Sequence, residues 1–207
     1  MMEPQGQWNK EHAESYSRWM RLVSRVFYSR FARAILKSLP SVSKAATVVD
    51  LGCGPGLLSI ELCKLLPNAR IIAVDPSAEM LEVARRNAVE VGVANYDARL
   101  GAAEHMPLAS NTVDLVVTQG SLHEWDSVEE GFSEILRVLR PGGSLIVKDF
   151  NRSWLSRWKR ALVEPFHHLG MFRYSFDDVV AFLDSAGFRG FEGDPAGLQF
   201  FVQATRP

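Results

Sequence analysis

Short apolar runs, each bounded by Gly, Pro or Asp, alternate with longer segments of helical periodicity over the middle of the chain. Such alternation is typical of parallel strands joined by crossover helices. The pattern predicts strands at 47–51, 71–74, 97–101, 113–118 and 144–148. It predicts helices at 57–66, from Ser77 onward and at 128–139. The predicted fold class is therefore α/β with a doubly wound sheet.

The two ends of the chain carry different patterns. Residues 1–45 have a helical pattern with one apolar side, formed by Met20, Val23, Phe27, Phe31 and Ile35. We expect a helical N-terminal extension whose arginines form a solvated basic face. Residues 151–175 have no clear strand, but Trp154, Trp158, Ala161 and Leu162 lie at helical spacing. This insertion either covers an acceptor site, packs against the sheet or docks at a membrane surface.

The remaining residues, 176–207, predict a closing helix and a strand pair. The helix is expected at 176–186, with Gly187 as its stop, and β-like runs follow near 188–192 and 199–204. A length of 207 residues fits one α/β domain, so we expect 1–207 to form a single domain.

Charge and cysteine content exclude several classes of protein. The 23 basic and 24 acidic side chains leave a formal charge of -1, which gives no overall field to attract nucleic acid. Cys53 and Cys63 form neither a C-x-x-C pair nor a metal-ligand cluster, so both are expected to be reduced thiols. The adjacent His167 and His168 lack further ligands nearby, so we expect no metal site.

The N-terminus lacks the apolar core of a signal peptide, and no apolar run is long enough to span a bilayer. We therefore expect a cytoplasmic protein without stable membrane insertion. Nothing in the sequence decides between a monomer and a homodimer.

A glycine-rich loop follows the first predicted strand directly. Gly52, Gly54 and Gly56 stand between that strand and the next helix, at the carboxyl end of the sheet, where ligands of open α/β sheets bind. Residues without a β-carbon let a ligand approach the backbone closely. The helix that begins near Leu57 also presents unpaired amide N–H groups to a polar ligand.

Asp75 ends the second predicted strand, and its carboxylate is therefore expected at the same edge of the sheet, where it can accept hydrogen bonds from two ribose hydroxyls. A dinucleotide-binding fingerprint requires G-x-G-x-x-G, whereas this loop has G-x-G-x-G followed by Leu57. The third glycine comes one position too early. A nicotinamide-dependent oxidoreductase is therefore an alternative rather than the leading interpretation.

Four blocks of sequence resemble, in the right order, the motifs of class I S-adenosylmethionine-dependent methyltransferases. They are Asp-Leu-Gly-Cys-Gly-Pro-Gly at 50–56, Ala-Val-Asp-Pro-Ser at 73–77 with Met80 and Leu81, Gly-Ala-Ala-Glu-His-Met-Pro-Leu at 101–108, and Leu-Arg-Pro-Gly-Gly at 139–143. The tail around Gly187 and 200–204 resembles the closing strand pair of that family. The resemblance implies a Rossmann-like fold, with a mostly parallel seven-stranded sheet and an antiparallel last strand. It makes 46–150 the cofactor-binding core.

The resemblance also implies roles for individual residues toward S-adenosylmethionine. The three loop glycines, with Cys53 between them, would line its methionine part, and Asp50 would receive its ammonium group. Asp75, followed by Pro76, would hold the ribose hydroxyls. Met80 would pack on the adenine face, a role suited to a polarizable thioether.

Further along the chain, the Ala103 amide would contact an adenine ring nitrogen, and Gln119 would contact the cofactor through its backbone carbonyl. The sequence departs from the family at Ala102, where many relatives carry an acid that accepts a hydrogen bond from the adenine amino group. Either Glu104 or water would replace that contact. The loss of one hydrogen bond is worth about 1 kcal/mol, which weakens the cofactor site without abolishing it.

The acceptor side is harder to predict, because methyl transfer needs mainly proximity and orientation, with a base only if the acceptor must lose a proton. His123 follows the fourth predicted strand and is the best candidate base, although a loop histidine is more often structural. Asp149, at the end of the fifth strand, either helps an acceptor or caps the following turn. The leading interpretation is methyl transfer from S-adenosylmethionine to a small organic acceptor at oxygen, nitrogen or carbon. A non-catalytic protein that binds S-adenosylmethionine is the second alternative.

Overall fold

The computed structural model describes residue 15 and residues 27–37, 46–154 and 171–207. By its internal contacts the chain divides into two compact units, residues 1–101 and 102–207, and each is described by itself. Trp158, His167 and His168 lie outside the described residues.

The first unit contains three parallel strands, β1 (Thr47–Leu51), β2 (Arg70–Asp75) and β3 (Tyr96–Leu100). β2 lies between the other two strands: its Ile72 pairs with Val49 of β1 on one side and with Asp97 of β3 on the other. The side chains of β1 and β2 are almost continuously buried, as expected for strands covered on both faces. The three predicted strands of this region are confirmed, and β3 begins one residue earlier than predicted.

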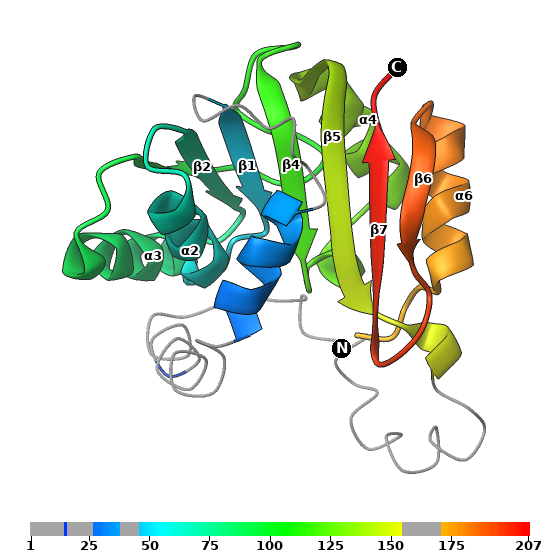
Figure 1. Ribbon diagram of the computed structural model, residues 1–207, viewed down its shortest axis with the longest axis horizontal. Helices are drawn as coiled ribbons and strands as arrows, with labels where there is room; N and C mark the ends of the chain where they lie inside the picture. Colours follow the sequence, from blue (N-terminus) through cyan, green and yellow to red (C-terminus); the bar gives the residue numbers. More distant parts are fainter. Residues whose placement is uncertain (1–14, 16–26, 38–45, 155–170) are drawn as a thin grey trace, which may run out of the picture. The chain divides into compact units, whose positions relative to one another are not determined.

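Two helices connect these strands, α2 (Leu57–Leu65) and α3 (Ala78–Val91), and both contact β2 and β3 (Figure 1). Ser77 caps the start of α3, since its side chain accepts a hydrogen bond from the Met80 amide at 3.1 Å, and the predicted start of this helix is confirmed. The helix ends at Gly92, which has a left-handed conformation with φ 77°.

Residues 27–37 are helical, which agrees with the predicted N-terminal extension. Phe31, Ala32 and Ile35 of this helix are buried, whereas Phe27 is 39% exposed. Met20 and Val23 of the predicted apolar side lie outside the described residues.

The second unit contains β4 (Val113–Gln119), β5 (Leu139–Phe150), β6 (Arg189–Asp194) and β7 (Gln199–Thr205), in the spatial order β4-β5-β7-β6. β4 and β5 are parallel, with Val116 opposite Leu145. β7 is antiparallel to both of its neighbours, and its Val202 lies opposite Val147 of β5. Figure 1 shows these strands side by side, with α6 against β6.

β5 is longer than the sequence indicates. A strand was predicted from Ser144, after a turn at Pro141–Gly143, but the strand begins at Leu139. Leu139 pairs with Val113, and Gly142 and Gly143 exchange backbone hydrogen bonds with Arg206, at 2.9 Å each. The strand therefore starts earlier than predicted, but its pairing with β4 is irregular at the expected turn: the register shifts between Val113 and Leu115, and Gly142 has φ 77°.

The helices of the second unit are α4 (Val128–Val138) and α6 (Phe176–Ala186), and two short 3-10 helices lie at η1 (Leu122–Glu124) and η2 (Arg152–Trp154). α6 contacts α4, β6 and β7. It starts with a capping box in which Ser175 and Asp178 bond reciprocally through side chain and backbone, and it ends at Gly187 with φ 104°.

The predicted fold class is confirmed: the chain has a mostly parallel seven-stranded sheet with an antiparallel last strand, and helices alternate with most of the strands. In the part of the chain that the structure describes, no helix combines the length and apolarity needed to cross a bilayer.

Candidate functional site

The glycine-rich loop is folded back onto the end of β2. Its three glycines have left-handed conformations, with φ 71° at Gly52, 51° at Gly54 and 76° at Gly56. The Gly52 and Cys53 amides both donate to the Val74 carbonyl, at 2.8 and 3.1 Å. A non-glycine residue would be strained at each of these left-handed positions, so the loop can follow this path only with glycine there.

Asp75 joins the loop to the start of α3. One of its carboxylate oxygens accepts a hydrogen bond from the Gly54 amide at 2.7 Å, and the other accepts from the Ser77 amide at 2.9 Å. The residue is only 7% exposed, so both bonds form in a partly desolvated setting that strengthens them. A carboxylate offers about four lone-pair positions, so it can accept several hydrogen bonds at once.

The glycines of the loop differ in what surrounds them. A Cβ on Gly56 would lie 2.9 Å from the Tyr96 hydroxyl and 3.0 Å from the Ala84 Cβ, so this glycine is packed against β3 and α3. A Cβ on Gly54 would have no heavy atom within 4 Å among the described residues. Gly56 is therefore required by packing, whereas Gly54 turns a bare stretch of backbone toward open space.

Asp50 lies at the end of β1 and is buried, with 2% exposure. It accepts a hydrogen bond of 2.5 Å from the Ser59 hydroxyl, which comes from α2. The pKa of the Asp50 carboxyl is raised to about 6, mainly because the group is buried. The hydrogen bonds from Ser59 lower this pKa, and the nearby charge of Asp75 raises it further. A nearby cation would stabilise its charged form.

Three residues that support the loop were not predicted from the sequence. They are Ser59, which bonds Asp50, Asn87, which donates to the Pro55 carbonyl at 2.8 Å, and Tyr96, which lies beneath Gly56. Asn87 could have been found, because it is a polar residue on the otherwise apolar side of α3 and is 6% exposed. A buried polar side chain normally has a hydrogen-bond partner.

The other predicted residues of the first unit lie around this loop. Cys53 is buried, and burial raises the pKa of its thiol well above the usual value, with a further increase from Asp75. It is therefore not a thiolate at neutral pH. Met80 is 3% exposed and packs with Val83, while Pro76 is exposed at the turn after β2.

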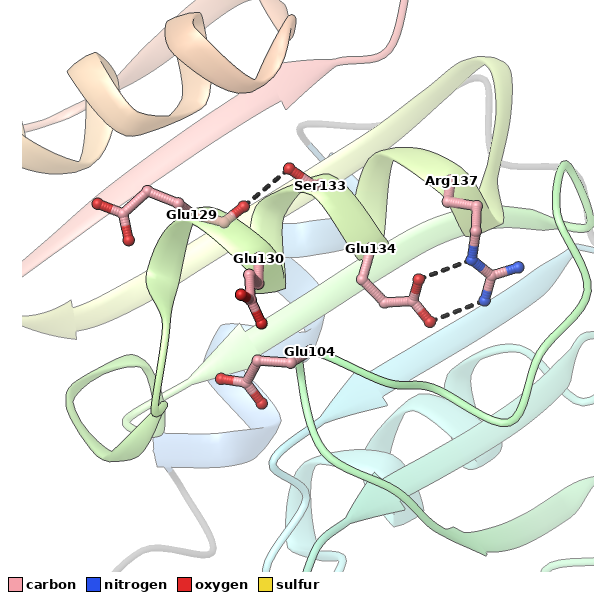
Figure 2. A pocket seen from close by; sticks show the side chains of 6 residues that line it. All are labelled: Glu104, Glu129, Glu130, Ser133, Glu134 and Arg137. Carbon is pink, nitrogen blue, oxygen red and sulfur yellow. Dashed lines mark hydrogen bonds and ion pairs between the residues drawn. The ribbon is translucent and has the colours of Figure 1, made fainter.

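In the second unit, Ala102, Ala103 and Glu104 form a turn in which the His105 amide donates to the Ala102 carbonyl at 3.2 Å. Ala103 is buried. The Glu104 carboxylate accepts a hydrogen bond from the Ser127 amide at 3.1 Å, at the start of α4. Figure 2 shows its side chain under α4, in an open groove lined by Glu104, Glu129, Glu130, Ser133, Glu134 and Arg137.

Gln119 ends β4, beside Lys148 of β5. Its side-chain Oε1 is buried and has no hydrogen-bond partner in the described part of the chain. A buried acceptor of this kind normally has a hydrogen-bond partner, and the Gln203 Oε1 is in the same position.

His123 and Asp149 form a nearly buried pair. The Nδ1 atom of His123, in η1, lies 3.1 Å from an oxygen of Asp149, at the end of β5, and the two side chains are 7% and 3% exposed. Asp149 also accepts a hydrogen bond from the Phe150 amide at 2.7 Å. Asp149 therefore bonds the backbone N–H of the next residue and also contacts the candidate base, while its help to an acceptor stays a prediction.

The environment of His123 acts on its pKa in both directions. Burial lowers the pKa of the imidazole, but the hydrogen bond and the charge of Asp149 raise it more, with a smaller increase from Glu124 and a decrease from Arg173. The net result is a pKa above 6.5. In the described residues, Nε2 makes no hydrogen bond and lies 4.0 Å from the Glu124 carboxylate.

The structure thus brings Asp50, Asp75 and the glycine loop together in the first unit, and His123 and Asp149 in the second. The methyltransferase domain model matches residues 42–171, which is more than half of the chain. The chain belongs to this methyltransferase domain family.

The methyltransferase is 40% identical over 120 residues to trans-aconitate 2-methyltransferase from Azoarcus sp., a match that covers 58% of this chain and 45% of the relative. The chain therefore spans less than half of that relative's length. A structure from Methanococcus maripaludis, provisionally assigned as an S-adenosylmethionine-dependent methyltransferase, shares the fold with a TM-score of 0.81 and 24% identity, over 100% of this chain and 97% of the other. A structure from Nostoc punctiforme, provisionally assigned as an O-methyltransferase, has a TM-score of 0.73 and 26% identity, over 95% of this chain and 59% of the other.

The cofactor of this methyltransferase family is S-adenosylmethionine. The residues of the first unit fit it chemically. Gly54 leaves backbone open to a ligand, Asp75 can accept from hydroxyls, and Asp50 is an acid whose charged form a cation would stabilise. In the described residues no group of three His, Cys, Asp or Glu side chains could hold a metal ion.

Proposed function

We propose that this methyltransferase transfers a methyl group from S-adenosylmethionine to a small organic acceptor. The observation that carries the proposal is the pair of hydrogen bonds that the Asp75 carboxylate accepts from the Gly54 and Ser77 amides. It places a buried carboxylate and an open stretch of glycine backbone within hydrogen-bond distance of each other. This pair suits a ligand that carries neighbouring hydroxyls and an adjacent polar chain.

Within the first unit, we assign Asp75 to the ribose hydroxyls and Gly52, Gly54 and Gly56 to the methionine part. Asp50 receives the ammonium group, directly or through water. Because the pKa of Asp50 is raised to about 6, the cation would favour its ionised form, and binding would release a proton near that pH. Cys53 and Pro76 contribute backbone to the same region, and Met80 offers its thioether to the adenine.

Within the second unit, the Ala103 amide is assigned to an adenine ring nitrogen and Gln119 to a cofactor contact. The orphaned Oε1 of Gln119 adds a side-chain acceptor to the backbone carbonyl expected at this position. Glu104 is a poor replacement for the acid absent at Ala102, because its carboxylate already bonds the Ser127 amide. Water is the better candidate partner for the adenine amino group.

The cofactor, when bound, supplies a methyl group on a positively charged sulfur. The chain orients the acceptor and, where that acceptor must lose a proton, removes it. His123 is the proposed general base, since its Nδ1 is held by Asp149 and its Nε2 makes no hydrogen bond among the described residues. The names of the Azoarcus and Nostoc punctiforme proteins support a small acceptor and transfer to oxygen, respectively.

The alternatives to this proposal are a nicotinamide-dependent oxidoreductase and a non-catalytic S-adenosylmethionine-binding protein. The protein would be incubated with S-adenosylmethionine labelled in its methyl group and with a low-molecular-weight metabolite fraction. We expect label in a small organic product and equal release of S-adenosylhomocysteine. Binding of the cofactor without any release under these conditions would favour the non-catalytic alternative. In a parallel incubation with the macromolecular fraction, label in nucleic acid or protein would contradict a small acceptor.

The proposal includes a cytoplasmic location, no nucleic-acid partner, and a monomeric or homodimeric state. The formal charge of -1 supports the second of these points.

A further inference from the structure

We propose that Asp149 positions His123 as the general base for an acceptor with a hydroxyl group on an aromatic ring, and that Phe150 and Phe172 hold that ring. The proposal rests on the methyl transfer proposed above and names the acceptor class and a positioning residue for it.

The contact with Asp149 fixes the tautomer of His123. An ionised carboxylate only accepts hydrogen bonds, so the contact of 3.1 Å between Asp149 and Nδ1 fixes the imidazole hydrogen on Nδ1. The basic lone pair is then on Nε2. Asp149 is itself fixed by the Phe150 amide at 2.7 Å, so the imidazole is held by a rigid strand rather than by a loop.

The pair lies at the carboxyl ends of β4 and β5. His123 follows the carboxyl end of β4, and Asp149 lies at the carboxyl end of β5, which is the parallel neighbour of β4. Ligands of open α/β sheets bind at this edge. A general base needs its basic nitrogen open to the acceptor, and among the described residues Nε2 of His123 makes no hydrogen bond.

Only some acceptors need a base. A carboxylate acceptor is ionised at neutral pH and needs no proton removed, whereas a phenolic hydroxyl has a pKa near 10, like that of tyrosine. A general base accelerates transfer to a phenol and contributes nothing to transfer to a carboxylate. The pair is therefore useful for a hydroxyl acceptor.

The surroundings of the pair are aromatic. The Phe150 ring meets the His123 ring edge-on, with centroids 6.2 Å apart, and the Phe172 ring lies 5.4 Å from Phe150. Both phenylalanines are half-buried. Rings pack favourably on other rings in offset or edge-to-face arrangements, so this pair suits a planar aromatic acceptor beside the base.

The O–H bond of the acceptor breaks, its proton goes to Nε2 of His123, and its electron pair stays on oxygen. That oxygen forms the new O–CH₃ bond while the S–CH₃ bond of the cofactor breaks with its electron pair left on sulfur. The imidazolium then loses its proton to solvent.

The charged groups that face the imidazole set its pH response. Asp149 raises the pKa of His123 against the effect of burial, Glu124 raises it less, and Arg173, which donates to the His123 carbonyl at 3.5 Å, lowers it. The variant Asp149→Asn removes the largest influence that raises the pKa of His123 against the effect of burial. The pKa of His123 should therefore fall.

The first experiment measures this pKa by NMR titration of the histidine ring in the protein without cofactor. The wild type should titrate above 6.5 and Asp149→Asn well below it. Asp184→Asn, which removes an exposed carboxylate paired with Arg189, serves as the matched control and should leave the titration unchanged. Equal titration of the wild type and Asp149→Asn would overturn the positioning role.

The second experiment compares catechol, benzoate and aniline as acceptors over a range of pH, with S-adenosylmethionine binding measured in parallel. We expect methylated catechol only, with an acidic limb in kcat/KM that moves to lower pH in Asp149→Asn. His123→Gln should lower kcat/KM by about 10²- to 10⁴-fold. Phe172→Leu should raise KM for catechol about 2- to 10-fold with little change in kcat.

Methylation of benzoate or aniline instead of catechol, or a His123→Gln variant as active as the wild type, would overturn this inference and leave the proposed methyl transfer standing. No methylated product from any of the three, while the cofactor binds, would also count against the phenolic acceptor. Failure to bind S-adenosylmethionine would overturn the proposed function itself. Melting temperatures of all variants separate these outcomes from loss of the fold.

Discussion

The Gly54 amide donates a hydrogen bond of 2.7 Å to the carboxylate of Asp75, and so connects the glycine-rich loop after β1 with the end of the neighbouring strand β2. The two residues are 21 positions apart in the chain. This bond fixes the loop at the carboxyl edge of the sheet before any ligand arrives. Preorganisation of this kind lowers the entropy cost of binding.

The first prediction concerns this carboxylate. In Asp75→Asn, one of the two backbone N–H donors faces an amide NH₂ group instead of an acceptor, and the ribose hydroxyls lose a charged partner. Hydrogen bonds to charged groups are worth about 1.5–3 kcal/mol, so the Kd for S-adenosylmethionine should rise about 10- to 100-fold. Asp97→Asn, on the exposed ion pairs of β3, is the control and should bind as the wild type does. Equal Kd values for the wild type and Asp75→Asn would contradict the assignment.

The second prediction separates the roles of Gly54 and Gly56. Alanine at Gly56 combines the strain of φ 76° with contacts of 2.9 and 3.0 Å to Tyr96 and Ala84. We expect a loss of about 2–5 kcal/mol in the free energy of unfolding. Alanine at Gly54 meets no described atom, so only the strain of about 1–2 kcal/mol remains.

Chemical denaturation measures both losses, and cofactor titration should show the larger decrease in affinity for the folded fraction of Gly54→Ala. Tyr96→Phe, which removes the hydroxyl nearest to Gly56, should restore part of the stability of Gly56→Ala. If Gly54→Ala proved the less stable of the two variants, the packing role of Gly56 would be wrong.

The third prediction uses the raised pKa of Asp50. Because its folded pKa of about 6 lies above the ordinary value of 3.8, the folded state holds the proton longer than the unfolded state does. This contribution to stability is complete below the unfolded pKa and is lost as the pH rises from about 4 through about 6. Asp50→Asn should lack this part of the pH dependence in denaturant titrations.

The same group predicts a proton released on cofactor binding. If Asp50 meets the ammonium group, binding near pH 6 should release protons, which calorimetry in buffers of different ionisation enthalpy detects. Asp50→Asn should abolish the release. Proton uptake in the wild type, or the same release in the variant, would exclude this contact.

The fourth prediction concerns the start of α6. Ser175→Ala removes half of the capping box with Asp178 and should lower the free energy of unfolding by about 1 kcal/mol. Ser133→Ala, an exposed serine inside α4 whose hydroxyl donates to the Glu129 carbonyl, is the matched control and should change stability little. Thermal unfolding of both variants checks the difference.

Periodicity and local signals were enough for most of the fold. The apolar runs gave β1, β2 and β4, and the serine before α3 and the glycine after α6 marked helix ends correctly, because these signals act within one turn of the chain. The start of β5 at Leu139 was missed. Its pairing with Val113 and the bonds to Arg206 come from distant segments that a local pattern does not show, and a register shift in the pairing with β4 accommodates Pro-Gly-Gly.

The candidate site was predicted in its residue types and not in its contacts. The glycines and Asp75 stood out because few residues can serve their roles, but the bond from Ser59 to Asp50 has no sequence signature, since it depends on how α2 packs against β1. The pairing of His123 with Asp149 likewise depends on the register of β4 and β5, and sequence reasoning considered the two residues separately.

Calorimetric titration of the intact protein with S-adenosylmethionine, S-adenosylhomocysteine and NAD tests the central claim most directly. We expect both sulfur compounds to bind with one-to-one stoichiometry, Asp75→Asn to weaken both, and NAD to give no saturable heat. Saturable binding of NAD together with no binding of either sulfur compound would contradict it.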